Sequence, residues 1–456
     1  MRLAVNSLLD VADLVRGVSY KRDEAQTTPG PGNVPILRAN NIRDGRLVFD
    51  DLVYVPAGRV SEVQRLRQGD IIIAMSSGSR DVVGKAALVT SEWDCAFGVF
   101  CGVLRAKKGT QTKWLAHFLQ SPAYRAAIDS VATGTNINNL SKTTLSSVQV
   151  PVMTGDEQAS TIRILDGISE HKSSGASHLL GARRAVERFR QAVLAAACSG
   201  RLTASWHGDA AVGPAIESLR KRTAERDRLG RRHQEPSLPR ESAPPDIPDR
   251  WCWASLAELG ELGRGKSKHR PRNDSRLYGG NFPFVQTGDI ARSDGRIRNH
   301  SQTYNEQGLS QSRLWPERTV CITIAANIAE SALLTYPACF PDSVVGLVAD
   351  ESVALPEYVE LFIRTAKRDL AAFAPATAQA NINLAILSDL AVPLPPLHEQ
   401  TEIIRRVGRI LSLAADVSSR IDAASQRADR SSQAVLAKAF RGEFDQIVAR
   451  SNEVLE

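Results

Sequence analysis

Residues 376–410 read ATAQANINLAILSDLAVPLPPLHEQTEIIRRVGRI, and residues 131–168 read VATGTNINNLSKTTLSSVQVPVMTGDEQASTIRILDGI. Both stretches contain, in the same order, Asn-Ile-Asn, a strand-like run that ends in Val-Pro, and a Glu-Gln pair that opens a helix. Glu399-Gln400 follows Glu157-Gln158 by 242 residues, and the Gln-Ala-Val-Leu segments at 191–194 and 433–436 keep this offset. The constant spacing predicts two like units in tandem, which suits a partner with two separate sites, such as a two-part DNA sequence.

Each unit is predicted to be a mixed α/β globule, because short β-rich runs alternate with turn signals and are followed by an amphipathic helix. In the first unit we expect strands at Ile71–Ala74, 86–89 and 99–104, and a helix over 112–131. In the second unit we expect strands at 319–324 and 344–348 and a helix over 356–373.

The segment after each Glu-Gln pair carries apolar residues at heptad spacing, which predicts two helices of about 40 residues and about 60 Å that pair with each other. Two unrelated amphipathic surface helices are the alternative. Lys172 and Gly175 interrupt the first seam, and Gly200 and Gly442 are expected to end the helices. The predicted interface residues are Leu165, Ile168, Leu179, Val186, Phe189 and Val193 in the first helix, and Ile403, Val407, Ile410, Val417, Ile421 and Val435 in the second.

The composition limits the class of protein. The chain has 456 residues, 43% hydrophobic and 23% charged, with a net charge of +7, which predicts two to four domains and favours a polyanionic partner. The six cysteines form no CxxC pair, so we expect free thiols in a reducing cytoplasm and no zinc ribbon. The N-terminus is too polar for a signal peptide, and no apolar run is long enough to span a membrane.

One motif suggests a nucleotide site. Residues 260–267 (GELGRGKS) fit the phosphate-binding pattern GxxxxGK[ST], and residues 344–351 (VVGLVADE) resemble the acidic segment that holds Mg²⁺ in such proteins. The context argues against this function, because a phosphate-binding lysine opens a helix, whereas Lys266 is followed by Pro271 and no apolar period. The first unit has no corresponding motif.

The same region is better interpreted as a DNA-facing loop. Residues 264–276 (RGKSKHRPRNDSR) hold six Arg or Lys residues, which can neutralise phosphates and reach base edges; a solvated basic loop is the alternative. The Asn-Ile-Asn segments at 136–138 and 381–383 occur in both units. Two readers of different sequences should differ at base contacts, so we interpret these asparagines as turn or cap residues.

Taken in order, these features resemble the specificity subunit of type I restriction–modification enzymes. The residues that carry the resemblance are the two NIN…VP…EQ segments, the Asp-Gly-Arg turns at 44–46 and 294–296, the Gln-Ala-Val-Leu helix ends, and Pro-Asp-Arg-Trp at 248–251. The resemblance covers almost the whole chain, and the order and duplication of the motifs make it specific.

The resemblance implies a non-catalytic, cytoplasmic protein that binds double-stranded DNA and no membrane. Two target recognition domains would each read half of a bipartite site, and the two long helices would pair antiparallel and set the spacing. Two modification subunits would supply S-adenosylmethionine-dependent methylation, and restriction subunits would supply ATP- and Mg²⁺-dependent translocation and cleavage; no cofactor is expected in this chain. The implied segments are recognition domain 1 (1–155), a spacer helix (156–204), a charged helix with a Pro-rich linker (205–250), recognition domain 2 (251–397), a C-terminal spacer helix (398–445) and a tail (446–456).

Candidate DNA contacts are chosen by residue type and loop position. In the first unit they are Lys21, Arg22, Arg38, Asn40, Asn41, Arg43, Ser77, Ser79 and Arg80. In the second unit they are Lys266, Lys268, His269, Arg270, Arg272, Asn273, Gln286, Thr287, Asp289 and Asn327.

Two other functions stay open at this point. The chain can be an enzyme, either a P-loop NTPase or the specificity-like part of a self-contained nuclease, in which case the pure chain hydrolyses nucleotide and Lys266→Ala abolishes the activity. It can also be a coiled-coil scaffold with no nucleic-acid role, in which case it assembles with partners but binds no DNA.

Overall fold

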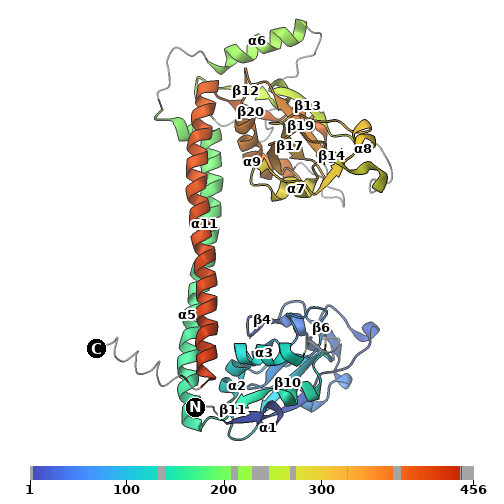
Figure 1. Ribbon diagram of the computed structural model, residues 1–456, viewed down its shortest axis with the longest axis vertical. Helices are drawn as coiled ribbons and strands as arrows, with labels where there is room; N and C mark the ends of the chain where they lie inside the picture. The colour runs from blue at the N-terminus through green and yellow to red at the C-terminus, as the bar shows by residue number, and fades with distance from the viewer. Residues whose placement is uncertain are drawn as a thin grey trace, which may run out of the picture. The chain divides into compact units, whose positions relative to one another are not determined.

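The computed structural model describes residues 4–131, 139–206, 214–228, 246–267, 274–325, 327–372, 382–441 and 443. The chain forms two compact units, one of residues 1–181 with 421–456 and the other of residues 182–420 (Figure 1). Each long helix therefore contributes one segment to each unit. Among the described residues, no helix is long and apolar enough to cross a membrane.

The first unit is built on a four-stranded antiparallel sheet in the order β2-β10-β7-β8. A second sheet has the order β6-β3-β9, and β1 pairs with β11. The elements are β1 (Val5–Ser7), α1 (Leu8–Val11), β2 (Ala12–Arg16), β3 (Asn33–Leu37), β4 (Ile42–Arg43), β5 (Arg46–Leu47), β6 (Val53–Pro56), β7 (Ile71–Ala74), β8 (Ala86–Leu88), β9 (Ala96–Phe97), β10 (Cys101–Ala106), α2 (Thr112–Phe118), α3 (Pro122–Val131), α4 (Lys142–Ser147), β11 (Gln149–Pro151) and α5 (Gly155–Cys198).

The second unit repeats this plan with the sheet β13-β19-β17-β18-β15 and the pairs β12-β20 and β14-β16. Its elements are α6 (Ala215–Arg228), β12 (Cys252–Ser255), β13 (Gly260–Arg264), β14 (Tyr278–Phe284), α7 (Thr287–Arg292), β15 (Arg296–Ile297), β16 (Gln302–Tyr304), α8 (Glu306–Ser310), β17 (Val320–Thr323), β18 (Ser331–Leu334), β19 (Val344–Ala349), α9 (Pro356–Ala372), α10 (Leu384–Ser388), β20 (Ala391–Leu394) and α11 (Leu397–Ala439).

The central strand of each sheet is buried on both faces. In β7, Ile71 and Ile73 belong to the apolar cluster that includes α2, whereas Ile72 and Ala74 belong to a cluster on the other face. In β17, Val320 and Ile322 likewise lie on the opposite face from Cys321. Side chains alternate across a strand, so burial of both faces requires the continuous apolar runs seen in the sequence.

The Glu-Gln pairs join each long helix to its globule through a buried glutamine. Gln400 Oε1 accepts from Leu355 N at 2.7 Å, and its Nε2 donates to Val353 O at 3.0 Å and Pro395 O at 2.8 Å. Gln158 does the same in the first unit, accepting from Gln111 N at 2.8 Å and donating to Met153 O at 2.9 Å. This shared arrangement explains why the motif occurs twice at a fixed offset.

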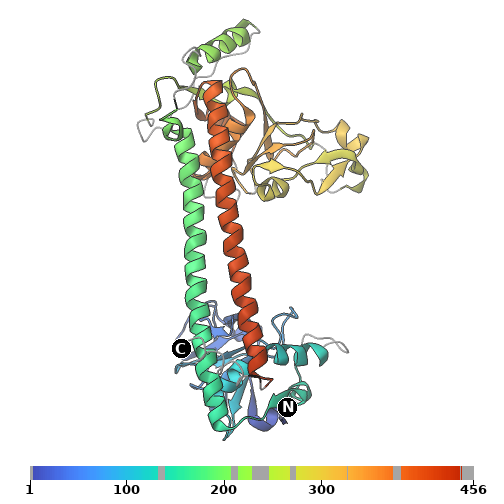
Figure 2. The same cartoon turned by 60° about the vertical axis from the view of Figure 1, so that its left-hand side comes forward.

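The helices α5 and α11 pack against each other within each unit (Figures 1 and 2). In the first unit Leu165 shares a buried cluster with Leu436 and Ala439, and Lys172 pairs with Asp429 at 2.9 Å. In the second unit residues 193–197 of α5 share a cluster with Ile403 and Val407 of α11. Residue numbers rise along one helix as they fall along the other, so the predicted antiparallel pairing is confirmed.

The predicted seam is wrong at two positions. Phe189 and Val417 are 49% and 46% exposed, and the next residues, Arg190 and Ser418, face each other, with Arg190 Nη2 donating to Ser418 Oγ at 3.4 Å. One residue corresponds to about 100° around a helix, so this shift moves both apolar side chains out of the interface. Lys172 does not interrupt the pairing, because its ammonium group finds Asp429 on the facing helix.

Several predicted boundaries also change. The helix expected over 112–131 is two helices, α2 and α3, and β10 begins at Cys101 because Val99 and Phe100 form a turn. Gly200 has φ of 77°, which fits its expected role beyond the end of α5. Gly442, residues 136–138, Asn381 and most of the Pro-rich linker lie outside the described residues.

Candidate DNA interface

In each unit, two polar loops leave the main sheet at the same edge. Strands β2 and β7 both pair antiparallel with β10, so their carboxyl ends meet at the edge where β10 begins. Lys21 and Arg22 follow β2, and residues 77–80 follow β7. We call this the reading edge of the first unit, and its two loops carry five residues of the predicted set, namely Lys21, Arg22, Ser77, Ser79 and Arg80.

The second unit has an equivalent reading edge, since β13 and β17 both pair antiparallel with β19. Lys266 follows β13 and is exposed, and Asn327 follows β17 with a left-handed φ of 55°. The backbone of this edge is well held: Ile324 N donates to Ser343 O at 2.9 Å, and Ser312 Oγ donates to Lys266 O at 2.8 Å. Lys268, His269, Arg270, Arg272 and Asn273 lie outside the described residues.

A close backbone contact fixes both edges in the same way. A Cβ atom at Gly17 would lie 2.1 Å from Gly98 O, and one at Gly265 would lie 2.3 Å from Pro341 O. Only glycine permits this approach. The Arg-Gly pairs at 16–17 and 264–265 therefore hold the loops that follow β2 and β13 against the turns that precede β10 and β19.

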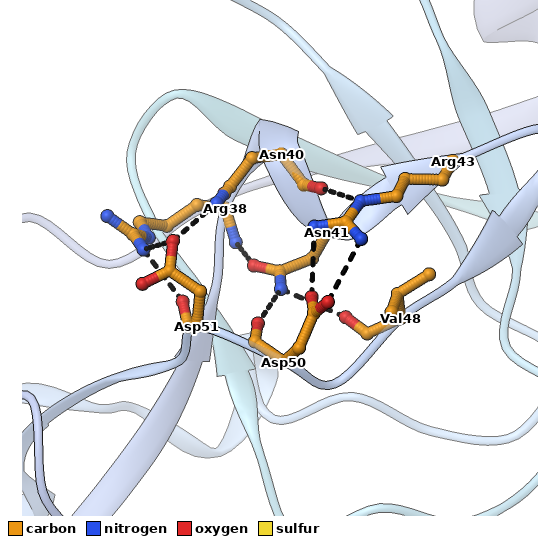
Figure 3. Close-up of polar contacts among 7 residues, drawn as sticks. All are labelled: Arg38, Asn40, Asn41, Arg43, Val48, Asp50 and Asp51. Atoms are coloured by element: carbon orange, nitrogen blue, oxygen red, sulfur yellow. Dashed lines mark hydrogen bonds and ion pairs between the residues drawn. The ribbon is translucent and has the colours of Figure 1, made fainter. Parts of the chain in front are cut away.

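The other predicted contacts of the first unit form an internal network instead (Figure 3). Asn41 is fully buried; its side chain accepts from Arg38 N at 2.8 Å and donates to Val48 O and Asp50 O. The prediction that Asn41 reads a base is therefore wrong, because its side chain ties the turn after β3 to the segment that follows β5.

The cations around Asn41 already have acidic partners. Arg43 makes a bidentate pair with Asp50 at 2.9 and 3.0 Å. Arg38 and Asn40 both donate to the same Asp51 carboxylate oxygen, at 2.8 and 2.9 Å (Figure 3). These three side chains are partly or largely exposed, but a phosphate has to compete with a carboxylate for each of them.

The equivalent turn of the second unit corrects a further prediction. Asp289 is buried, and its carboxylate accepts from Gln286 N at 3.0 Å, Ser301 Oγ at 3.0 Å and Arg292 Nη2 at 2.8 Å. Asp289 thus caps α7 and is not available to accept from cytosine. Gln286 Nε2 donates to Gln302 Oε1 at 2.7 Å, and Thr287 is half-buried as the first residue of α7.

Sequence reasoning missed two groups near the reading edges. Arg313 lies over the Trp315 ring at 3.8 Å and pairs with Glu261 at 2.8 Å, in a loop with no distinctive pattern. Val99 and Phe100 were assigned to a strand, where alternation would bury one of them, but both are exposed. No sequence signal distinguishes this turn from the start of β10.

The P-loop interpretation fails on geometry. Residues Gly260–Arg264 form strand β13, which pairs residue by residue with β19 from Arg264↔Val345 to Gly260↔Ala349. They do not wrap into a phosphate-binding loop. Asp350 accepts from Ser352 Oγ and pairs with Arg222 at 2.9 Å, so it serves as a turn residue.

The type I restriction modification DNA specificity domain matches residues 4–174 and again residues 248–420. This chain belongs to that family. It is 30% identical over 446 residues to the StySPI type I restriction enzyme specificity subunit of Salmonella potsdam, covering 95% of this chain and 87% of that protein. It is 31% identical over 439 residues to the EcoKI type I restriction enzyme specificity subunit of Escherichia coli strain K12, with the same coverage.

Structural comparison agrees with this assignment. A solved chain from work on complex assembly and conformational transition of the type I R-M system has a TM-score of 0.68 at 17% identity, covering 97% of this chain and 98% of that one. At this identity the likeness concerns the fold. The two specificity-domain matches each contain one reading edge and end within a long helix, which agrees with the repeat seen in the sequence.

Proposed function

We propose that this chain is the DNA-reading subunit of a type I restriction–modification complex. Residues 1–155 and 251–397 act as two target recognition domains, each of which reads one half of a bipartite site. The observation that carries the proposal is that the two units share the same backbone framework but expose different residues at their reading edges. Gly17 and Gly265, and Gln158 and Gln400, make the same contacts in both units, whereas the exposed edge residues differ.

Among the described residues, the two edges differ in the side chains that they expose. The first presents Lys21, Arg22 and Arg80 beside exposed Phe100, and the second presents Lys266 beside Asn327. Cations neutralise phosphates without regard to sequence, while polar and apolar groups read base edges. Two such unlike edges suit two different half-sites.

The paired helices supply the spacing and a docking face. Phe189, Leu413 and Val417 each precede a seam residue by one position, and in an antiparallel pair such positions lie on the same flank. Their exposures of 49%, 59% and 46% make an apolar strip in the second unit. We propose that a modification subunit covers this strip, since exposed apolar patches mark protein interfaces.

The chain itself supplies recognition and assembly but no chemistry. S-adenosylmethionine, ATP and Mg²⁺ act in the modification and restriction subunits, and the complex works on double-stranded DNA in the cytoplasm.

The decisive experiment is to map methylated adenines in the DNA of cells that express this chain with its partners. We expect one motif with two defined halves and a gap of fixed length. The purified complex should bind a duplex with that motif, and its affinity should fall steeply with salt. A complex that methylates or binds without sequence preference contradicts the proposal.

A further inference from the structure

The most exposed large apolar side chain in the part of the chain that the structure describes is Phe100, at 64%. Val99 beside it is 48% exposed. Both lie in the turn before β10, at the centre of the reading edge of the first unit. A large apolar side chain that is exposed to solvent among polar loops indicates a binding surface.

The backbone that carries Phe100 is fixed on several sides. Phe100 O accepts from Met75 N at 2.8 Å and Ser76 N at 3.1 Å, and Cys101 N donates to Gly98 O at 2.8 Å. Gly98 is in turn held by the close approach of Gly17. These backbone bonds fix the place from which the phenyl ring projects, so binding has little backbone freedom left to remove at this position.

The surroundings of Phe100 suit DNA. Lys21 and Arg22 follow β2 on one side, and Arg80 follows β7 on the other. Glu24 accepts from Arg59 and from Lys21 N, and Asp129 is held by Arg125 at 2.6 Å and lies 3.9 Å from Arg80 Nε. An apolar group flanked by cations is complementary to a groove lined by phosphates that displays methyl groups.

Phe100 is also specific to the first unit. Ser343 takes its place in the second unit, because its carbonyl accepts from Ile324 N at 2.9 Å as the Phe100 carbonyl accepts from Met75 N. A residue needed for the fold would be shared by both units, and so would one that binds a partner common to both. A residue that reads one half-site is expected to differ.

We propose that Phe100, with Val99, makes an apolar contact with a thymine C5-methyl group in the major groove of the half-site read by the first unit. This inference rests on the proposed function. Thymine is the base that offers an apolar group in that groove, and aromatic or aliphatic side chains are its ordinary partners.

The test uses the complete methyltransferase complex and a duplex with the mapped motif at constant salt. Each thymine of the two half-sites is replaced in turn by deoxyuridine, which removes only the methyl group. We expect one replacement, in the half-site of the first unit, to weaken binding by about fourfold to tenfold. Phe100→Ala should weaken binding to the normal duplex by at least as much and should abolish the effect of that replacement.

Two further variants serve as controls for Phe100→Ala. Phe100→Leu keeps an apolar group and should retain most of the affinity, and Val63→Ala removes an exposed apolar side chain elsewhere in the first unit and should change nothing. A thermal midpoint equal to that of the parent complex verifies folding. If the parent binds its bipartite motif but Phe100→Ala binds equally well, or responds to every deoxyuridine as the parent does, this inference is overturned while the proposed function stands. If the parent shows no sequence preference, the proposed function itself fails.

Discussion

Gln158 and Gln400 show how a single residue ties a helix to a globule. Each side chain is buried and pairs with backbone groups of two loops that are distant in sequence. A buried backbone group left without a partner costs its full desolvation penalty, about 1–3 kcal/mol. The glutamine therefore holds the first turn of α5 or α11 against the loop that starts α2 or α9.

The first prediction concerns the hydrogen bonds of Gln400. Gln400→Ala leaves Leu355 N, Val353 O and Pro395 O without their bonds, so we expect the free energy of unfolding to fall by about 3 kcal/mol or more. Urea denaturation of the full chain measures it. Gln191→Ala is the control, because Gln191 is exposed and its side-chain amide donates to Glu187 of the same helix. Equal effects from the two variants would contradict the role assigned to Gln400.

Glu360 gives a pH-dependent prediction. Burial raises its pKa to about 7 from an ordinary 4.5, despite the nearby Arg364 guanidinium and a hydrogen bond from Ser331. The carboxyl lines a cavity of about 150 Å³ between α9 and α11 within the second unit. Between these two pKa values the folded state binds the extra proton, so stability falls as pH rises from 4.5 to about 7 and stays low above it.

Glu360→Gln removes that titration. We expect the variant to be more stable than the parent at about pH 8, by up to about 3 kcal/mol, and to gain little at about pH 5. Urea denaturation at both pH values provides the measurement. Glu306→Gln, at an exposed helix end, should leave the pH dependence unchanged. A parent chain equally stable at both pH values would show that the Glu360 carboxyl does not control stability.

At the scale of elements, the apolar strip on the helix pair can be tested directly. Val417→Glu places a charge at the centre of the strip formed with Phe189 and Leu413, and we expect it to weaken association with the modification subunit by at least tenfold. Ser419→Glu is the matched control, because it puts the same charge on the same exposed helix outside the strip. Analytical ultracentrifugation of the mixed subunits gives the result. Undiminished assembly of Val417→Glu would remove the strip as a docking face.

The helices also show what the sequence could and could not predict. The heptad period and the fixed offset predicted two long helices and their pairing, because apolar spacing depends only on helix geometry. The register failed at Phe189 and Val417 because Arg190 and Ser418 can be accommodated in the seam by bonding to each other. Such a pair is visible only once both helices are placed.

The residues of the candidate site also fall into those that the sequence could predict and those that it could not. Lys21, Arg22, Ser79 and Arg80 follow β2 and β7, which run parallel on either side of β10, and all four are exposed, as their loop positions predicted. Asn41 and Asp289 have the right chemistry for a base contact, but each caps its own turn. Short polar side chains serve turns and ligands equally well, so residue type alone could not separate the two roles.

At the scale of the whole molecule, the proposed function makes the length of the helix pair determine the gap between the two half-sites. Inserting one heptad into α5 and a matching heptad into α11 keeps the seam in phase and lengthens the pair by about 10 Å. We expect the methylated motif to keep both half-sites and to widen its gap by about three base pairs, since a base pair rises about 3.4 Å. Methylation mapping in cells detects the change.

Insertion into α5 alone provides the contrasting case. It lengthens one helix of an antiparallel pair without its partner, so the surplus turns have to loop out or the seam has to slip, and we expect methylation of the bipartite motif to be lost. If the doubly extended chain keeps the parental gap, or loses one half-site while retaining the other, the distance between the two readers is not set by these helices. The gap should change with helix length in whole base pairs while the half-sites stay the same. This result is expected only if the reading edges recognise the half-sites and the α5–α11 pair sets the gap.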